Sequence, residues 1–496
     1  MAVLKRVKLF VDHRIKLNLN EIDDETFAGL KERFKYGNPE YYKIKATRGF
    51  VSNGVLPYFT SYEIMPKYIT FSRGTINIIR KFLKLQGYDV EVIDNRLFKP
   101  LDKPFIDHST YQLRDYQEKN VAHLKFFQQG LMRGVCGCGK TEVGSEVVRQ
   151  LSQWTLIIVH KKRLLVQWRK RIAKRFGIDM NDIGIWGDGT KEIKPITIGL
   201  VQSVIKDVDK LRDKFGAIIV DECHHAPAET FTEIIDSFPA AYRIGLSATM
   251  ERKDGKHVLM YDAFGNIVTE VTKEMLMERE LIHDAEIIIV PTEFKCEEYY
   301  YKSKKKGYTY LVQKMILDKD RNRLIYSYLN KELNDNHYCI VLSDRVRFCK
   351  NWKKWLEQKD IVAKLLIGEN DAESEEALDL LEEELLHCVI GTTVADEGLD
   401  APILDRGFGT TPTALHPSRL IQQVGRIERI SNNKQDAKYY YFWDKWIGGF
   451  EEHPRAIMKK FNNVSIILPD GTKEILKKNG KKGIMWTRLM PIIYST

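Results

Sequence analysis

The sequence predicts an α/β protein with two tandem parallel-sheet domains, a small N-terminal α/β domain and a short basic C-terminal extension. Two observations favour this architecture. Short apolar strands recur between residues 111 and 445, each followed by a helical stretch, and such alternation is typical of parallel sheets covered on both faces. The length of 496 residues suits two to four domains at about 100–200 residues each.

The N-terminal region, residues 1–108, is expected to be the small α/β domain. The strands expected from alternating apolar residues cover 3–19, 68–72 and 89–93, and the helices expected from helical spacing cover 24–34 and 75–85. Pro100 and Pro104 lie in a polar stretch that indicates a linker.

Two series of apolar strands follow, separated by a break near residues 270–330. The first series is 156–159, 197–200, 217–220 and 243–246, and the second is 338–342, 364–367, 388–391, 406–409 and 439–442. We place the first parallel-sheet domain at 109–285 and the second at 286–450. The extension 451–496 contains a Pro-Asp-Gly turn that predicts a β-hairpin over 464–476.

Composition excludes several classes of protein. No apolar run approaches the roughly 20 residues of a membrane-spanning helix, and the amino terminus lacks the apolar block of a secretory signal. Seven cysteines include no C-x-x-C pair, so neither a disulfide framework nor a zinc site is indicated. We expect a soluble, intracellular protein, of the cytoplasm of a bacterial host, without a membrane partner.

The net charge of +10 is concentrated at the two ends of the chain. Residues 1–110 carry 19 Lys or Arg against 13 Asp or Glu, and residues 455–496 carry 9 against 2. Basic ends around a near-neutral centre indicate appendages that bind a polyanion. The alternative is that these are solvated lysines that serve only solubility.

The strongest motif is Gly134-Val-Cys-Gly-Cys-Gly-Lys-Thr141, a G-x-x-x-x-G-K-T phosphate loop. Its glycines allow backbone N–H groups to face phosphate oxygens, Lys140 supplies a positive charge, and the Thr141 hydroxyl can ligate Mg²⁺. A helix after Lys140 would add its positive end to the site. Chance matches to this pattern occur, so the loop needs support from its context.

Asp221 and Glu222 supply that context, because they directly follow the buried strand run that ends at Val220. Ligands of parallel sheets bind at the carboxyl ends of strands. There Asp221 can hold Mg²⁺ and Glu222 can orient and deprotonate the attacking water. The alternative, a strand end capped by acidic residues, is common when no phosphate loop precedes it.

A third element, Gln422-Gln-Val-Gly-Arg-Ile-Glu-Arg429, belongs to the second series. Arg426 and Arg429 are three residues apart, so on a helix they share one face. Two guanidinium groups that converge on a γ-phosphate suit a transition state in which charge spreads over oxygens. An ordinary basic amphipathic helix is the alternative, but it does not account for Gln422 and Gly425.

Taken in order, six motifs resemble the RecA-like motor of superfamily 2 helicases. They are residues 113–117, 134–141, 221–224, 247–249, 398–400 and 422–429, and the resemblance spans about residues 111–445. Within that superfamily, residues 113–117, 221–225 and 245–255 resemble the XPB and phage UvsW branch, most of all the phage branch-migration helicases. The region around residues 38–41 and 78–94 is similar to the amino-terminal part of phage and bacterial members.

The resemblance implies roles for individual residues. The catalytic set would be Lys140, Asp221, Glu222, Gln422, Arg426 and Arg429, with Mg²⁺ on Thr141 and Asp221. ATP would bind to Arg114, Gln117, Gly134, Gly137, Gly139, Lys140, Thr141 and Asp400, with Gln117 reading adenine. His224, Ser247, Ala248 and Thr249 would couple hydrolysis to movement. Nucleic-acid contacts would come from Lys161, Arg163, Gln202, Ser203, Asp344, Arg345, Thr392 and Thr393.

Cys136 and Cys138 stand where members of the family usually carry other small residues. Thiols near Lys140 and a helix start can have a lowered pKa and oxidise readily. The alternative is neutral drift to another small side chain.

Residues 299–310 interleave tyrosines with Lys304, Lys305 and Lys306. Aromatic rings stack on bases and lysines meet phosphates, so this segment is a candidate wedge or grip on DNA. The alternative is a helix whose tyrosines pack inward while its lysines extend along the surface.

Together these features predict an ATP- and Mg²⁺-dependent DNA helicase that remodels branched or duplex DNA without reading its sequence, as a monomer. Alternatives in the same class are an XPB-like duplex translocase with little strand separation and an RNA helicase. A nucleotide-gated DNA clamp that does not travel is the alternative from another class.

Overall fold

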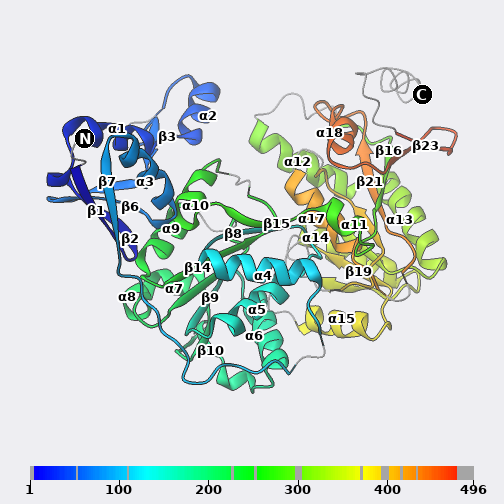
Figure 1. Ribbon diagram of the computed structural model, residues 1–496. Helices are drawn as coiled ribbons and strands as arrows, with labels where there is room; N and C mark the ends of the chain where they lie inside the picture. Colours follow the sequence, from blue (N-terminus) through cyan, green and yellow to red (C-terminus); the bar gives the residue numbers. More distant parts are fainter. Residues whose placement is uncertain are drawn as a thin grey trace. The chain divides into compact units, whose positions relative to one another are not determined.

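The computed structural model describes residues 5–51, 54–108, 111–224, 228–250, 254–296, 304–368, 372–392, 401–413, 417–431 and 434–476. The chain divides into two compact units, Met1–Thr272 and Lys273–Thr496 (Figure 1). Each unit contains one large parallel sheet. The predicted fold class is therefore confirmed.

The N-terminal region of the first unit is a five-stranded sheet in the order β5-β6-β2-β1-β7. Its strands are β1 (Lys5–Val11), β2 (Arg14–Asn18), β5 (Tyr62–Ile64), β6 (Tyr68–Ser72) and β7 (Tyr88–Asp94). Helices α1 (Asp24–Arg33) and α3 (Ile76–Leu85) bury Leu30, Ile79 and Leu83 with the sheet. The helices expected in this region and the strands expected at 68–72 and 89–93 are confirmed, whereas the single strand expected over 3–19 is two antiparallel strands, β1 and β2.

A small lobe extends from this sheet. It consists of β3 (Lys35–Gly37), α2 (Pro39–Arg48) and β4 (Tyr58–Thr60), and β3 pairs antiparallel with β4. We call the described residues 35–51 and 54–60 the α2 lobe.

The large sheet of the first unit has the order β11-β10-β12-β9-β13-β14-β8-β15 and is parallel apart from the β10–β11 pair. Its strands are β8 (Gln129–Gly134), β9 (Thr155–Val159), β10 (Gly184–Gly187), β11 (Thr190–Glu192), β12 (Ile196–Leu200), β13 (Ala217–Asp221), β14 (Tyr242–Ser247) and β15 (Ile267–Val271). Every residue of β9 and β13 is buried, as expected for strands covered on both faces.

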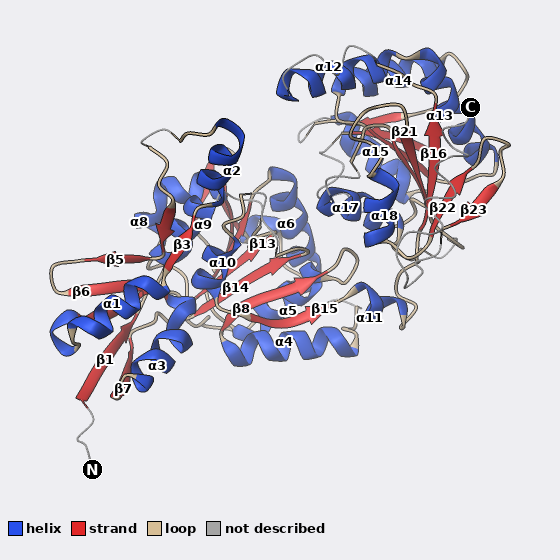
Figure 2. Ribbon diagram, turned by 90° about the horizontal axis from the view of Figure 1, so that it is seen from above, coloured by secondary structure: helices blue, strands red, loops and turns tan. Residues whose placement is uncertain are grey.

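Helices cover both faces of this sheet (Figures 1 and 2). They are α4 (Asp115–Phe127), α5 (Lys140–Leu151), α6 (Lys162–Phe176), α7 (Val201–Val204), α8 (Val208–Leu211), α9 (Ala228–Ser237) and α10 (His257–Phe264). Residues of α9 and α10 pack on one face through Phe231, Ile234 and Met260.

The small N-terminal sheet is attached to the large sheet through buried polar contacts. The Arg73 guanidinium, 1% exposed, donates to the carbonyl oxygens of Ala240 (2.7 Å) and Ala241 (3.1 Å). A Cβ on Gly74 would lie 2.2 Å from the backbone nitrogen of Gly265, so only glycine fits there. The two sheets of the first unit are therefore packed tightly against each other at this point.

The segment that was expected to be a linker is attached along its length. Leu101 N donates to Ser152 O and His108 N donates to Arg175 O, both at 2.8 Å. Lys99 N also donates to the buried Gln153 side chain at 2.7 Å. The prolines mark the absence of regular structure here, but backbone hydrogen bonds to the large sheet domain hold the segment in place.

The sheet of the second unit has the order β18-β19-β17-β20-β21-β16-β22-β23, all parallel except the final hairpin. Its strands are β16 (Glu286–Thr292), β17 (Cys339–Leu342), β18 (Lys364–Leu366), β19 (Cys388–Gly391), β20 (Arg406–Gly409), β21 (Lys438–Asp444), β22 (Val464–Ile467) and β23 (Lys473–Ile475). The predicted C-terminal hairpin is confirmed as β22 and β23. Strand β16 lies in the stretch where the sequence predicts a break.

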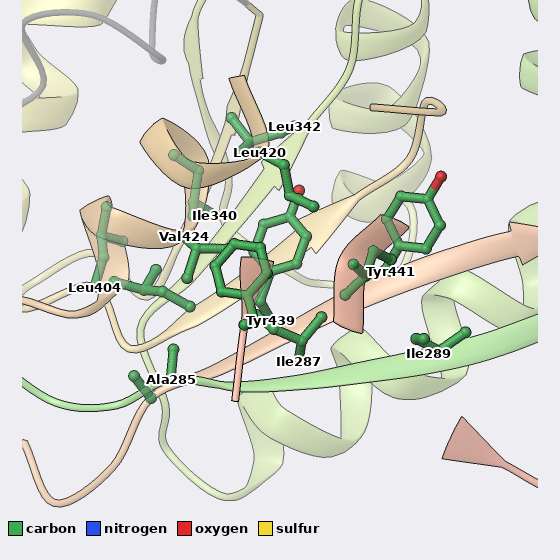
Figure 3. Packing of buried hydrophobic residues seen from close by; sticks show 14 of the residues in the cluster. Ala285, Ile287, Ile289, Ile340, Leu342, Leu404, Leu420, Val424, Tyr439 and Tyr441 are labelled. Carbon is green, nitrogen blue, oxygen red and sulfur yellow. The ribbon is translucent and has the colours of Figure 1, made fainter. Parts of the chain in front are cut away.

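Two buried clusters form the core of the second unit, one on each face of the sheet. The helices described are α11 (Lys273–Met277), α12 (Lys304–Leu317), α13 (Lys319–Asn334), α14 (Val346–Glu357), α15 (Ala372–Glu382), α17 (Pro417–Ile427) and α18 (His453–Lys460). Figure 3 shows Leu420 and Val424 of α17 against Tyr439 of β21 and Ile340 of β17. These contacts anchor α17 to the sheet.

Candidate active site

The phosphate loop connects β8, which ends at Gly134, to α5, which begins at Lys140. Gly137 and Gly139 have φ values of 83° and 79°, in the left-handed region that favours glycine. A Cβ on Gly139 would lie 2.3 Å from Gln117 Nε2. The loop thus needs its glycines both for backbone conformation and for close packing, and it leads into a helix N-terminus that favours anions.

Lys140 lies between the loop and the first acidic motif. Its Nζ donates to Gly134 O at 3.0 Å and lies 3.4 Å from Glu222 Oε1. Burial opposes its charge, but the Glu222 and Asp221 carboxylates and the neighbouring thiols together outweigh that effect, so the pKa of Lys140 is above its usual value. Lys140 is therefore a fully charged group available to a triphosphate.

Asp221 is the last residue of β13 and is 6% exposed. One carboxylate oxygen accepts from Trp168 Nε1 at 2.9 Å and the other from Glu222 N at 3.0 Å. Burial and the neighbouring Glu222 charge raise the pKa of Asp221. A bound cation would offset that cost.

Glu222 has a φ of 48°, an unfavourable backbone conformation for a non-glycine residue. Such strain is concentrated at functional sites. The side chain is 22% exposed and reaches Lys140 on one side and His224 Nδ1, at 3.3 Å, on the other.

A hydrogen-bonded chain continues from His224 to the end of β14. His224 Nδ1 lies 2.7 Å from Ser247 Oγ, and Thr249 N donates to that same oxygen at 3.2 Å. Ser247 Oγ also donates to Thr249 O. Ala248, between them, is half-buried. The structure thus connects three of the four predicted coupling residues to Glu222 through a chain of successive contacts.

Gln117 was predicted to read adenine together with Arg114. The Gln117 side chain is fully buried; its Oε1 accepts from Tyr111 OH (2.8 Å) and Arg114 N (3.0 Å), and its Nε2 donates to Cys138 O (3.1 Å). Gln117 therefore links the segment before α4 to the phosphate loop.

The redox hypothesis for Cys138 assumes a lowered thiol pKa, and this assumption is wrong. The Cys138 thiol is fully buried, and burial raises its pKa to about 11 although Lys140 is nearby. The Sγ atom also occupies the space that a Cβ on Gly134 would need, 2.5 Å away. Cys138 is a small packing residue of the loop.

In the second unit, α17 presents Gln422 and Arg426 half-exposed while Leu420, Val424 and Ile427 are buried. Arg426 and Arg429 were predicted to share a helix face, and this is wrong because α17 ends at Ile427. Beyond it the Glu428 carbonyl accepts from His283 N at 2.7 Å, and Arg429 forms an isolated bridge with Ile282. A tertiary contact thus ends the helix before Arg429.

Glu428, between the two arginines, is buried and forms an ion pair with the half-buried Lys273, the first residue of the second unit. Lys273 Nζ lies 2.5 Å from Glu428 Oε1 and 3.0 Å from Asp284 Oδ1. Burial raises the pKa of Glu428, and the adjacent carboxylates raise the pKa of Lys273 although burial opposes it. The chain that enters this unit is thereby attached to the arginine segment.

The predicted nucleic-acid residues are distributed over both units. Arg163 lies in the first turn of α6 after Lys161, Gln202 is exposed and Ser203 half-buried in α7, Arg345 precedes α14, and Thr392 is buried after β19. Asp344 pairs with Arg419. Lys304, Lys305 and Lys306 begin α12, but their side chains, Thr393 and Asp400 lie outside the described residues. Tyr308 of α12 packs inward and donates to Pro412 O at 3.3 Å.

Mg²⁺ was expected on Thr141 and Asp221. Within the described ranges no group of three or more His, Cys, Asp and Glu is arranged to hold a metal ion. A site made of one carboxylate, one hydroxyl and substrate phosphates does not need such a group, because Mg²⁺ is commonly held in that way. The oxygen donors and the raised pKa of Asp221 fit this ion.

Comparison with known proteins places these motifs in a family. Residues 110–252 match the model "Type III restriction enzyme, res subunit", and residues 320–431 match "Helicase conserved C-terminal domain". The DNA 3'-5' translocase XPB2 of Sulfurisphaera tokodaii is 28% identical over 389 residues, which cover 71% of this chain and 85% of that protein. The chain is a superfamily 2 helicase related to XPB.

One solved structure shares the fold of this helicase, and a second has a weaker likeness to it. Dbp5 of S. cerevisiae, bound to RNA and ADP BeF3, is 15% identical with a TM-score of 0.51, over 72% of this helicase and 90% of that chain. The crystal structure of T4 UvsW has 16% identity and a TM-score of 0.44, over 93% of this helicase and 99% of that chain. Among the described residues of the helicase, no helix is long and apolar enough to cross a membrane.

Sequence reasoning missed Trp168, Tyr111 and Lys273. Trp168 is buried on α6, and its position relative to Asp221 follows from the fold rather than from a local motif. No local sequence motif marks Lys273, because its partner Glu428 is 155 residues away in the sequence.

Proposed function

We propose that this helicase uses ATP and Mg²⁺ to move along DNA and to remodel branched DNA, by branch migration and fork regression. Its family implies nucleotide use. The observation that carries the proposal is the connection of Lys140, at the start of α5, through Glu222 and His224, which follow β13, to Ser247 at the end of the adjacent strand β14.

In this proposal, Lys140 and the helix N-terminus of α5 bind the β- and γ-phosphates. Thr141 and Asp221 would hold Mg²⁺, and the ion would supply positive charge against the charge that develops on the phosphate oxygens. Glu222 accepts a proton from the attacking water, and its contact with Lys140 holds the carboxylate beside the phosphate loop. When phosphate leaves, Glu222 and His224 rearrange, and Ser247 transmits that change to the segment after β14.

Residues 109–285 would be the ATP-binding motor domain and residues 286–450 the second motor domain. The family resemblance implies that Gln422, Arg426 and Arg429 would act on the γ-phosphate and that Asp400 would contact the nucleotide. The domain 1–108 and the extension 451–496 would bind DNA through their basic surfaces. DNA as the substrate is supported by the relative XPB2, which is named a DNA 3'-5' translocase.

The experiment is a panel of ATPase rates with duplex, single-stranded, forked and four-way DNA and with structured RNA, at equal nucleotide concentration. We expect the largest stimulation from branched DNA and ATP-dependent dissociation of the four-way junction. Strong DNA stimulation without dissociation would instead favour an XPB-like duplex translocase. Preference for RNA would favour an RNA helicase.

A triplex-displacement assay distinguishes movement from clamping. A translocase removes the third strand in an ATP-dependent manner, whereas a nucleotide-gated clamp leaves it in place. The Glu222→Gln variant, which should bind but not hydrolyse ATP, is the matched negative control.

A further inference from the structure

Strand β7 is one edge of the N-terminal sheet. It has seven residues and pairs in parallel with β1 (Figure 2). Among the described residues no second strand pairs with it, so the main-chain groups of every other residue are directed outward, away from β1. An edge strand of this length is a template on which another polypeptide segment can form hydrogen bonds.

Several devices that commonly protect an edge strand are missing from β7. Its sequence, Tyr-Asp-Val-Glu-Val-Ile-Asp, contains no proline, glycine or lysine. The register with β1 is continuous from the Lys5–Tyr88 pair to the Val11–Asp94 pair, so no bulge twists the edge away. The opposite edge of the sheet, β5, has only three residues. The sheet therefore offers a long template on the β7 side alone.

The apolar face of the sheet is incompletely covered at β7. Val90 lies opposite Val7 of β1 and Val92 lies opposite Leu9, so these four side chains share one face. Val7 and Leu9 are fully buried, whereas Val92 is 39% exposed. An apolar side chain from a strand added outside β7 would remove this exposed surface from water.

The other face of β7 carries acidic side chains. Asp89 lies opposite Arg6 of β1 and Glu91 lies opposite Lys8, and Arg6 Nε is 3.8 Å from Asp89 Oδ2. Opposite charges on neighbouring strands stabilise a sheet, and like charges destabilise it. Basic residues on an added strand would therefore be favoured beside Asp89 and Glu91. A second copy of β7 would bring acidic residues together on one face, which is unfavourable.

We infer that β7 is the docking site of a partner protein, which adds an extended segment to this edge with apolar and basic residues in alternation. The apolar residues would contact the face of Val90 and Val92. The basic residues would lie beside Asp89 and Glu91. Main-chain hydrogen bonds provide affinity in this mode of binding, and the alternating side chains provide specificity.

The attachment of the N-terminal sheet determines what such a partner would be fixed to. Arg73 donates to main-chain oxygens of the large sheet domain, and Gly74 lies against the backbone of Gly265. A protein bound at β7 would therefore be held against the domain that carries the phosphate loop. The inference goes beyond the proposed function, because it concerns a protein partner and not DNA or ATP.

The probe is a fluorescent peptide with the sequence of β1, Lys-Arg-Val-Lys-Leu-Phe-Val. This sequence is chosen because its parallel register against β7 is known from the structure. The control peptide has the same composition, with its three basic residues placed together at one end. Fluorescence anisotropy measures binding of each peptide to the whole chain, and hydrogen exchange followed by mass spectrometry locates the bound segment.

Two variants change the edge and two matched controls change other surfaces. Val92→Lys places a charge on the apolar face of the edge, and its control is Val362→Lys, an exposed position of the second unit. Asp89→Lys with Glu91→Lys reverses the acidic face, and its control is Glu382→Lys with Glu383→Lys, two exposed residues of the second unit. Each control has the same change of net charge as its variant.

We expect the alternating peptide to bind about tenfold more tightly than the control peptide and to slow amide exchange in residues 88–94. Each edge variant should weaken that binding by about tenfold, and each control by less than about twofold. Thermal unfolding of the double charge variant should match that of the natural chain, which keeps the test decisive if Val92→Lys impairs folding.

Equal binding of the two peptides, equal effects of variants and controls, or protection outside residues 88–94 would overturn the inference. Self-association of the natural chain in sedimentation velocity, abolished by Val92→Lys, would also overturn it, because the edge would then belong to a second copy. None of these outcomes bears on the proposed function, since the ATPase panel contains no peptide.

Discussion

Two aspartates occupy the same place in the two large sheets but have different surroundings. Asp221 ends β13 in the first unit, and Asp444 ends β21 in the second. Asp444 accepts from Arg321 Nε and from the Thr292 hydroxyl, both at 2.7 Å, and Arg321 is itself buried. Asp221 instead accepts from a neutral indole and a backbone N–H.

In the proposed function, this difference separates a structural charge from a catalytic one. A buried carboxylate that is fully compensated by an arginine is satisfied and has no further chemistry to offer. A buried carboxylate with only neutral donors in direct contact remains electrostatically costly, and a cation reduces that cost. Position at a strand end is therefore not sufficient for a site; incomplete compensation of charge is the distinguishing property.

The largest expected effect concerns the reaction centre of the first unit. Glu222→Gln should lower the ATPase kcat by about 10²–10⁴-fold with little change in KM, because the amide keeps the shape but cannot accept the proton. Steady-state ATPase assays measure this, with the exposed Glu233→Gln as the matched control. Retention of more than a tenth of the natural kcat would contradict the assignment of Glu222 as the base.

The second prediction concerns Arg321, which compensates the buried charge of Asp444 in the second unit. Arg321→Met should lower the free energy of unfolding by about 3–5 kcal/mol, because Asp444 is left as an uncompensated buried charge. Urea denaturation measures this. Combining Arg321→Met with Asp444→Leu should recover most of the loss. A single variant that costs less than about 1 kcal/mol would show that Asp444 is not buried as described.

The third prediction is that removing the charge of Asp221 changes the free energy of unfolding in the opposite direction. Asp221→Asn should raise the free energy of unfolding at pH 8 by about 1–3 kcal/mol without nucleotide or Mg²⁺, because it removes a desolvated charge. Since the folded-state pKa of Asp221 is above its unfolded value, its ionisation lowers stability as pH rises between the two values. The advantage of the variant should therefore vanish towards pH 4. Destabilisation at pH 8 would remove the contrast with Asp444.

The smallest expected effect concerns the ion pair at the arginine segment. Lys273→Met and Glu428→Gln should each lower kcat by about threefold to tenfold with unchanged KM for ATP, because the pair positions the end of α17 rather than the nucleotide. The double variant should be no slower than the slower single variant, and a double-mutant cycle of kcat measures this. Additive losses would mean that the two residues act independently.

Features encoded locally could be predicted, and features that depend on tertiary contacts could not. The phosphate loop needs particular residues at fixed spacing, and Asp221 follows a fully apolar strand, so both were visible in the sequence. Strand β16 was missed because Pro291 and the polar residues after it resemble the end of a domain. Its place between β21 and β22 depends on pairing with strands more than 140 residues later.

The end of α17 at Ile427 shows the same limit of local reasoning. Helical spacing continues through Arg429, but the Glu428 carbonyl and carboxylate are drawn to His283 N and Lys273. Likewise the polar stretch with Pro100 and Pro104 reads as a free linker, although partners on the large sheet domain hold its backbone. These outcomes depend on residues that the motif itself does not contain.

The contact that Arg73 and Gly74 make with the large sheet domain has a mechanical consequence. The Arg73 guanidinium donates to main-chain oxygens, and Gly74 lies against the backbone of Gly265. These contacts leave almost no freedom of movement between the N-terminal sheet and the large sheet of the first unit. A force that a nucleic-acid strand exerts on the N-terminal domain would therefore be transmitted to the large sheet domain, which carries Lys140. Stall force in a single-molecule trap should consequently fall when Gly74→Ala loosens that contact, even where unloaded ATP turnover is preserved.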